Sequence, residues 1–209
     1  MLRKETVSPE LLKVLLELMK VDFLKKFRLV GGTALSLQLG HRSSIDIDLF
    51  TDKAFNKEQL VNDMKERFKV FPSRNDLSTG AAFDFNGIKV DIFNWGVPFL
   101  KPAHVIEGIR LSSTEDIAAM KFEAVITRGV KKDYWDIAEL LDKHTINEMV
   151  HFFKMKYFNA DHRQVLDNLQ MFERADNDID PKSYHGQTWQ SVKEKISKAL
   201  KKYIAEQFQ

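Results

Sequence analysis

The chain has 209 residues, of which 44% are hydrophobic and 30% are charged, a composition typical of a soluble globular protein with one good-sized domain or two small ones. Lysine and arginine number 32 against 30 acidic residues, so any binding of nucleic acid has to come from a local basic patch. The lack of cysteine excludes disulfides, thiolate metal sites and a cysteine nucleophile. No apolar run reaches the length of a membrane span and the N-terminus is too charged for a signal peptide, so we expect a cytoplasmic protein with no membrane partner.

The first part of the chain is predicted to alternate between helix and strand. Ser8 and Pro9 begin a helix that we expect to extend to residue 26, because proline is favoured at the first helical position. The alternating sequence IDIDLF predicts a strand. The elements after the first helix are expected in this order: a strand at 27–30, a turn at Gly31-Gly32, a short helix at 33–39 and a strand at 45–50.

The clearest pattern in the middle of the chain is a β-hairpin at residues 81–95. Asn86-Gly87 lies between two runs of alternating residues, as a type I′ turn requires. The elements around the hairpin are expected at these residues: a helix at 56–68, a short strand at 69–71, a loop at 73–80 and a short strand or loop at 104–111.

The second half of the chain is predicted to be helical. Ser113 caps a helix with the sequence TEDIAAMKFEAVITR, and another helix begins near Lys131. Further segments are expected as follows: amphipathic helices at 147–158 and 163–174, a loop at 177–187 and a last helix at 188–206. The whole pattern predicts an α+β fold, in which a small mixed sheet with flanking helices is followed by a helical C-terminal part. We expect the division between residues 1–112 and 113–209.

Two aspartates in the strand at 45–50 are the first candidate site residues. Alternation puts Asp46 and Asp48 on one face, roughly 6.5–7 Å apart at their Cα atoms. Carboxylates this close repel each other unless a cation lies between them. Alternating Ile and Asp also describes an antiparallel strand with one solvated face. The Gly31-Gly32 turn and helix start just upstream favour a metal site, because backbone N–H groups there bind phosphate.

Asp91 and Lys121 are candidates on two further elements. Asp91 lies on the second hairpin strand, where it is either a solvated strand residue or a third acid beside Asp46 and Asp48. Lys121 lies on the apolar stripe of its helix, four residues from Ile117 and from Val125. Burial of an unpaired ammonium is costly, so its stem either packs while the amine reaches water or the amine binds an anion. We favour the anion.

A charged cluster lies at the start of the helix near Lys131. Asp133 and Asp136 precede core positions by four residues, so both point toward or beside the inward face, near Arg128, Lys131 and Lys132. Acids at a helix start can also be simple partners of the helix dipole. The lysines of the last helix are expected mainly on a solvated face, with contact to RNA as the alternative.

Two stretches together resemble the AbiEii-type abortive-infection nucleotidyltransferases, whose fold is that of the DNA polymerase β-like nucleotidyltransferases. They are GGTALSLQLGHRSSIDIDLF and RGVKKDYWDIAELL, and the resemblance covers roughly residues 25–142. The positions that match the family's motifs are Gly31, Gly32, Thr33, Arg42, Ser44, Asp46, Asp48, Lys121, Lys132, Asp133 and Asp136, with Asp91 as candidate for the third acid.

The resemblance implies a Mg²⁺-dependent transfer of an NMP unit from an NTP to an acceptor hydroxyl, with Mn²⁺ as the alternative metal. RNA, and tRNA in particular, is the implied acceptor, and a cognate antitoxin is the implied partner. The implied metal ligands are Asp46, Asp48 and Asp91. The implied catalytic residues are these three with Lys121 and Asp136, and the implied nucleotide-binding residues are Gly31, Gly32, Thr33, Arg42, Ser44, Lys121 and Asp133.

Three points stay open at this stage. Toxins of the family tend to have a longer C-terminal helical part than the 67 residues after Asp142, which leaves toxicity and the choice of RNA undecided. A metal-dependent nuclease or phosphatase would use the same acids without a triphosphate-binding lysine. A regulatory protein could keep the fold and bind nucleotide without turnover, and a protein could replace RNA as acceptor.

Overall fold

A computed structural model describes residues 1–74 and 78–207. In these residues seven strands form one sheet in the order β3-β4-β5-β2-β1-β7-β6. The sheet is mixed, because β2 pairs with β5 and β1 pairs with β7 in parallel while the other pairs are antiparallel. The strands are β1 (Arg28–Leu29), β2 (Ile47–Thr51), β3 (Pro72–Arg74), β4 (Gly80–Phe85), β5 (Ile88–Asn94), β6 (His104–Ile106) and β7 (Ile109–Leu111).

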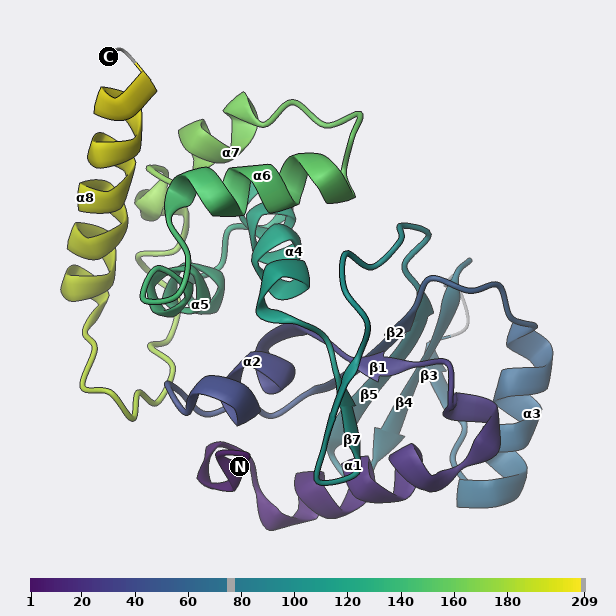
Figure 1. Cartoon of the computed structure of the whole chain (residues 1–209). Coiled ribbons are helices and arrows are strands. Elements are labelled where there is room, and N and C mark those ends of the chain that lie inside the picture. Colours follow the sequence, from purple (N-terminus) through teal and green to yellow (C-terminus); the bar gives the residue numbers. More distant parts are fainter. Residues whose placement is uncertain (75–77, 208–209) are drawn as a thin grey trace.

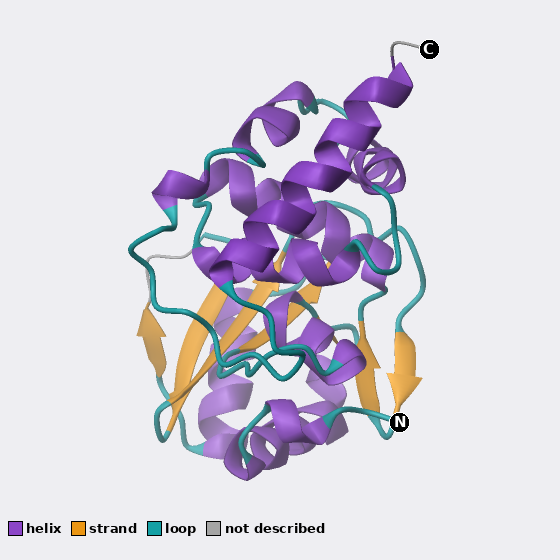
Figure 2. Cartoon of the chain, turned by 90° about the vertical axis from the view of Figure 1, so that its left-hand side faces the viewer, coloured by secondary structure: helices purple, strands orange, loops and turns teal. Residues whose placement is uncertain are grey.

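Helices lie on both sides of this sheet, and the later ones form a separate layer. Figure 1 shows α4 to α8 gathered at one end of the sheet, with α1 and α3 at the other end, and Figure 2 shows the same division from the side. The helices are α1 (Pro9–Lys20), α2 (Gly31–Leu39), α3 (Lys57–Phe68), α4 (Thr114–Thr127), α5 (Lys131–Leu140), α6 (Ile146–Lys156), α7 (Arg163–Asn168) and α8 (Trp189–Gln207). The α+β prediction is confirmed.

The two central strands have the side-chain alternation expected from the sequence. Ile47 and Leu49 of β2 are fully buried, while Asp48 between them is only partly buried. The strand begins two residues later than expected, and the side chain of Ile45 does not join the core, since the residue is 75% exposed. Period-2 burial therefore fixes which face carries the acids, although Asp46 precedes the strand.

Both hairpins close through residues with positive φ. Asn86 and Gly87 have φ angles of 53° and 90°, as the type I′ prediction requires. The second hairpin, β6–β7, turns at Glu107 and Gly108 with φ angles of 51° and 81°. From the sequence, this segment is expected to be either a strand or a loop, because glutamate rarely adopts positive φ and so does not predict a hairpin turn.

Several expected boundaries are wrong in detail. The first helix ends at Lys20 and is followed by a 3₁₀ turn at Asp22–Leu24, and the helix expected at 163–174 is α7 plus a 3₁₀ turn at Phe172–Arg174. The strand expected at 69–71 lies at Pro72–Arg74, since Lys69 ends α3 in the left-handed conformation. Residues 75–77 of the expected loop at 73–80 lie outside the described residues.

One hydrophobic core extends through the described chain, from Leu2 to Tyr203. The last strand ends at Leu111 and α4 begins at Thr114, on either side of the expected division at 112 and 113, which stays a prediction. None of the described helices has the length and apolar character needed to cross a membrane.

A buried ion pair between α4 and α6 also holds the loop before β6. The Nζ of Lys156 lies 2.9 Å from Oδ1 of Asp116, and both side chains are fully buried. Asp116 also accepts hydrogen bonds from the backbone N–H groups of Leu100 and Lys101. The acid in the first turn of α4 therefore does more than face the helix dipole.

Asp116→Ala should lower the free energy of unfolding by about 3–5 kcal/mol, because it leaves the ammonium of Lys156 buried without its partner. Chemical denaturation measures the change. The control Asp22→Ala removes an acid from the exposed pair with Lys25 and should change stability little. Equal effects of the two substitutions would contradict a structural role for the buried pair.

Candidate active site

The parallel pairing of β2 and β5 brings the predicted acids together. Asp48 lies directly opposite Asp91 in the register of the two strands, and Asp46 lies just before β2. We call these three side chains the carboxylate row. Asp48 and Asp91 are 43 residues apart in the sequence, so it is the pairing of their strands that makes them neighbours.

The electrostatics of the carboxylate row reflect this crowding. Burial raises the pKa of Asp48 to about 6, and the nearby charges of Asp91 and Asp46 add to the effect. Oδ2 of Asp91 accepts a hydrogen bond of 2.6 Å from Lys89 Nζ. Oδ1 of Asp91 is buried and has no hydrogen-bond partner in the described residues. Buried carboxylate oxygens usually have a hydrogen-bond partner, so this oxygen is a candidate ligand for a cation.

The donor set of the carboxylate row fits a hard divalent cation. No group of three acids or histidines in the described residues is drawn together closely enough to hold an ion by itself. Asp46 instead faces Lys132, with 3.7 Å between the carboxylate and the ammonium. Mg²⁺ commonly binds through one or two carboxylates, with waters and substrate phosphates as the other ligands. Asp48 and Asp91 suit this mode.

Two glycines bring the start of α2 against these side chains. The helix begins at Gly31 with no side-chain cap, so its first N–H groups are free of a capping side chain. Gly31 has a φ of 69°, and a Cβ there would lie 2.6 Å from Oδ2 of Asp48. A Cβ at Gly32 would collide with Nη2 of Arg42. Glycine at both positions allows this approach, so the first N–H groups of α2 lie beside the carboxylate row, and N–H groups at helix starts are suited to binding anions.

Thr33 and Ser44 connect the helix start to the segment before β2. The hydroxyl of Thr33 donates to the backbone carbonyl of Asp46 and lies 2.8 Å from Oγ of Ser44. Thr33 is buried, so its hydroxyl is used inside the protein. A ligand at the helix start would meet the backbone of Thr33 more readily than its hydroxyl.

Asp136 is the centre of a buried charged network. Its carboxylate accepts a bidentate pair of hydrogen bonds from Arg42, at 2.6 and 2.8 Å, and lies 2.8 Å from Nε2 of His41. Lys121 Nζ lies 2.6 Å from Asp136 and 2.8 Å from Asp133. Burial alone would raise the pKa of Asp136, but Arg42, Lys121 and the hydrogen bond with His41 hold it well below its usual value.

Lys121 is held inside the protein by the two helix-start acids. Its side chain is only 5% exposed, so the amine does not reach water, and snorkelling is excluded. Burial alone would lower its pKa, but the attraction of Asp133 and Asp136 raises it. Arg128 places its guanidinium on Asp133 from the other side, at 2.8 and 3.0 Å. Both acids thus orient cations beside the helix start.

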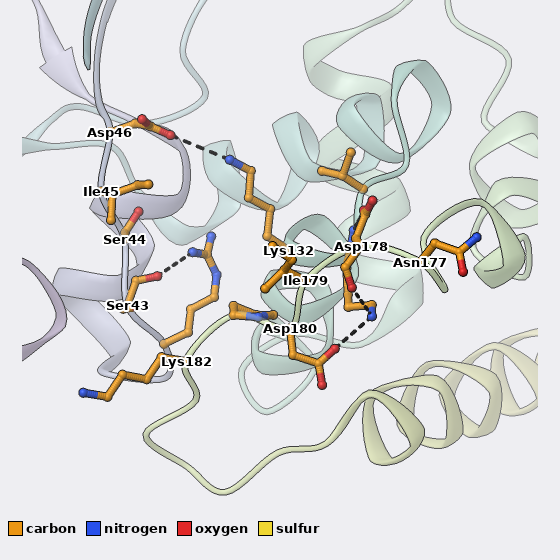
Figure 3. A pocket seen from close by; sticks show the side chains of 14 residues that line it. Ser43, Ser44, Ile45, Asp46, Lys132, Asn177, Asp178, Ile179, Asp180 and Lys182 are labelled. Atoms are coloured by element: carbon orange, nitrogen blue, oxygen red, sulfur yellow. Dashed lines mark hydrogen bonds and ion pairs between the residues drawn. The ribbon is translucent and has the colours of Figure 1, made fainter. Parts of the chain in front are cut away.

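An open cleft of about 640 Å³ lies on the Asp46 side of the carboxylate row. Its walls are residues 42–46, residues 130–132 at the start of α5, and the loop 177–182. Figure 3 shows Lys132 extending across this cleft toward Asp46, with Ile179 and Asp180 on the loop side. A second cavity of about 190 Å³ lies on the Asp91 side, where the rings of Phe50 and Trp95 stack at 4.9 Å.

The loop wall of the cleft depends on Lys131, which the sequence shows only as one of several charges near Asp133 and Asp136. Lys131 is buried, and its Nζ donates to the carbonyls of Asp176 and Asp178 at 3.2 and 2.5 Å and to Asp180 Oδ1 at 2.8 Å. The backbone N–H of Ser43 donates to Lys182 at 2.9 Å, so the loop also joins the segment before β2. Sequence reasoning missed this docking, since 177–187 has no periodic pattern.

Several lysines near the cleft and on the last helix are paired with acidic side chains. In the last helix, Lys195 pairs with Asp142 at 2.7 Å and Lys193 pairs with Asp176 at 3.3 Å. Lysines with acidic partners contribute less to attraction of a polyanion. Lys132 and Lys182 are the basic side chains that line the cleft without such burial.

Comparisons with known proteins identify the family of the chain. The family model for the nucleotidyl transferase AbiEii toxin of type IV toxin–antitoxin systems matches residues 13–91 and 87–208. An uncharacterised protein of Aquifex aeolicus (strain VF5) is 32% identical over 189 residues, which cover 85% of this chain and 88% of that protein.

Solved structures show a similar fold. A candidate nucleotidyltransferase of Helicobacter pylori has a TM-score of 0.56 at 18% identity and covers 92% of this chain and 91% of its own. The antibiotic-resistance factor ANT(2'')-Ia has a TM-score of 0.52 at 15% identity, over 71% of this chain and 92% of its own.

The raised pKa of Asp48 makes a testable contribution to stability. Its pKa is about 6 in the fold against an ordinary value of 3.8, so the folded protein binds this proton more tightly than the unfolded chain. Stability should therefore fall as pH rises from about 4 to about 6. The variant Asp48→Asn lacks this titrating group. In metal-free buffer, its free energy of unfolding minus that of wild type should therefore rise by about 1–2 kcal/mol between about pH 4 and about pH 6, a figure reduced for the solvent screening of a partly buried group.

Urea denaturation at a series of pH values gives this difference directly. Asp22→Asn is the control, because the side chain of Asp22 is 86% exposed and its removal should give a flat difference. A flat difference for Asp48→Asn as well would mean that Asp48 titrates normally in the folded protein.

Proposed function

Because the chain belongs to the AbiEii nucleotidyl transferase family, and is thus a transferase, we propose that it moves an NMP unit from an NTP to an acceptor hydroxyl with Mg²⁺ or Mn²⁺. The observation that carries this proposal is the register of Asp48 with Asp91 beside the glycine start of α2. It puts a pair of oxygen ligands next to a phosphate-binding helix start. The metal would neutralise charge on the phosphates.

Each side chain of the site then has a task. The oxygen of the acceptor hydroxyl forms a bond to the α-phosphorus, the bond to the β-phosphate oxygen breaks, and pyrophosphate leaves. Asp91, whose Oδ1 has no partner among the described residues, would take the proton of the hydroxyl. The helix start at Gly31 and Gly32, with Arg42 and Ser44 beside it, would hold the triphosphate.

The buried network around Asp133 and Asp136 would position the cations of the site. Asp136 fixes Arg42 and Lys121, and Asp133 fixes Lys121 and Arg128, so the cations are oriented before substrate binds. Preorganised charges stabilise a transition state without reorganisation during the reaction. In this proposal Asp133 and Asp136 act through the cations and do not contact the nucleotide.

The cavities on both sides of the carboxylate row support a reaction with two substrates. The cleft adjoins Asp46 and the second cavity adjoins Asp91. A phosphatase needs room for one phosphorylated substrate and water, whereas transfer needs room for a donor and an acceptor.

The acceptor we propose is RNA, with tRNA first, and we further propose a cognate antitoxin partner and a cytoplasmic location. The family description as a type IV toxin–antitoxin component supports the antitoxin. A solved complex of ANT(2'')-Ia contains adenylyl-2''-tobramycin, so a small molecule carries the nucleotide in that protein. Small molecules and proteins therefore have to be tested as acceptors beside RNA.

Incubation with each α-labelled NTP and Mg²⁺ or Mn²⁺, in parallel with total RNA, total protein and a small-molecule extract, tests the proposal. Label should enter RNA with wild type, and Asp48→Ala should abolish transfer because one of the two paired oxygen ligands is lost. Asp22→Ala, on an exposed side chain, should transfer at the wild-type rate. Transfer by Asp48→Ala at near wild-type rate would refute the metal assignment. RNA breakage would indicate the nuclease alternative, and binding without transfer would indicate the regulatory one.

The cleft gives a separate prediction for the acceptor. Lys182 is exposed and lines the cleft, so Lys182→Glu should weaken labelling of RNA and reduce the salt dependence of RNA binding by about one phosphate contact. Lys201→Glu makes the same charge change at an exposed site on α8 and should have a smaller effect. Equal effects would argue for general attraction, and label in a protein or a small molecule would replace RNA as acceptor.

A further inference from the structure

Lys89 is a cation in direct contact with the carboxylate row. It lies on β5 two residues before Asp91, so both side chains project from the same face of the strand. Its Nζ is 2.6 Å from Oδ2 of Asp91, and the Lys89 side chain is 55% exposed while that of Asp91 is 17% exposed. The ammonium therefore reaches the row from the solvent side.

The partner of Lys89 is specific. On β4, the residue directly opposite Lys89 is Asp84, another acid on the same face. In the described residues, Lys89 nevertheless pairs with Asp91, and Asp84 accepts a hydrogen bond from the backbone of Gly87 at 2.8 Å. A cross-strand pair with Asp84 would serve a purely structural purpose equally well.

The other cations near the row are engaged with different acids. Lys121 is bound by Asp133 and Asp136, Arg128 by Asp133, and Lys132 approaches Asp46 at 3.7 Å. Lys89 is thus the cation in direct contact with Asp91. Its contact covers Oδ2, and the buried Oδ1 has no partner in the described part of the chain.

We propose that Lys89 is a counter-ion which competes with the divalent cation for Asp91 and thereby sets the affinity of the site for metal. The inference rests on the metal-dependent function proposed above and deepens it. A hard cation binds oxygen ligands, and Asp91 can offer it both carboxylate oxygens only when the ammonium of Lys89 no longer contacts Oδ2. Release costs little, because Lys89 has a flexible four-carbon stem and an exposed end.

The competition has a direct consequence for the empty site. Without a divalent ion, Lys89 reduces the repulsion between Asp91 and Asp48, so the folded protein tolerates the row. With a divalent ion, the same ammonium is a like charge near the metal. Lys89 therefore stabilises the metal-free state and weakens metal binding, which is a role separate from holding the fold together.

Direct Mn²⁺ titration, followed by the loss of the free-ion EPR signal, tests this proposal without any turnover. Lys89→Met keeps the length of the side chain and removes its charge, so it should bind Mn²⁺ roughly fivefold more tightly than wild type. Lys89→Arg keeps the charge and should bind no more tightly than wild type. Lys53→Met is the matched control, since Lys53 is 73% exposed and lies 3.8 Å from Asp52, and it should leave the affinity unchanged.

The outcomes separate this inference from the function on which it rests. Equal or weaker binding by Lys89→Met overturns the competition, and weaker binding would show that Lys89 positions Asp91 for the metal. Absence of Mn²⁺ binding in both wild type and Lys89→Met overturns the metal site of the proposed function as well. Lys89→Gln serves as a second neutral variant if Lys89→Met does not fold, and thermal unfolding checks that each protein is folded.

Discussion

The interaction on which the site depends is the contact of one buried carboxylate with three cationic or polar partners. Asp136 has no exposed surface and binds Arg42, Lys121 and His41. These partners come from the segment before β2 and from α4, while Asp136 comes from α5. Burial of one charge without the others would cost several kcal/mol, so the network forms as a unit or not at all. It ties the late helices to the sheet at the start of α2.

The geometry of the phosphate-binding side follows from this contact. Arg42 is held by Asp136 with its guanidinium against Gly32, at the place where any Cβ would lie. Asp48 is pressed in the same way against Gly31 on the other flank of the helix start. The two glycines therefore set the separation between the cationic side and the acidic side of the site. A change in the position of Arg42 would move one flank relative to the other.

The sequence predicted those parts of the protein that depend on local pattern. Alternation around Ile47 and Leu49 placed the acids on one face, and Asn86-Gly87 specified its turn, because both signals lie in adjacent residues. The pairing of Asp48 with Asp91 was an expectation that local pattern alone could not establish, since strand order is a long-range property. The docking of loop 177–182 gave no signal, because Lys131 holds it through backbone carbonyls, which every sequence has, and through acids 47 and 49 residues further along the chain. Lys131 looked like one more charge in a basic run.

That mode of attachment has a consequence for how the protein can vary. Lys131 holds the loop through the carbonyls of Asp176 and Asp178 and through the carboxylates of Asp178 and Asp180, and Ser43 holds it through the carbonyl of Lys182. The side chain of Ile179, between these two acids, is not needed for this attachment, and the residue is 94% exposed. A side chain of this kind can be exchanged while the backbone path and the two acids stay in place. The loop is an adaptable wall, through which substrate preference can diverge without change in the chemistry.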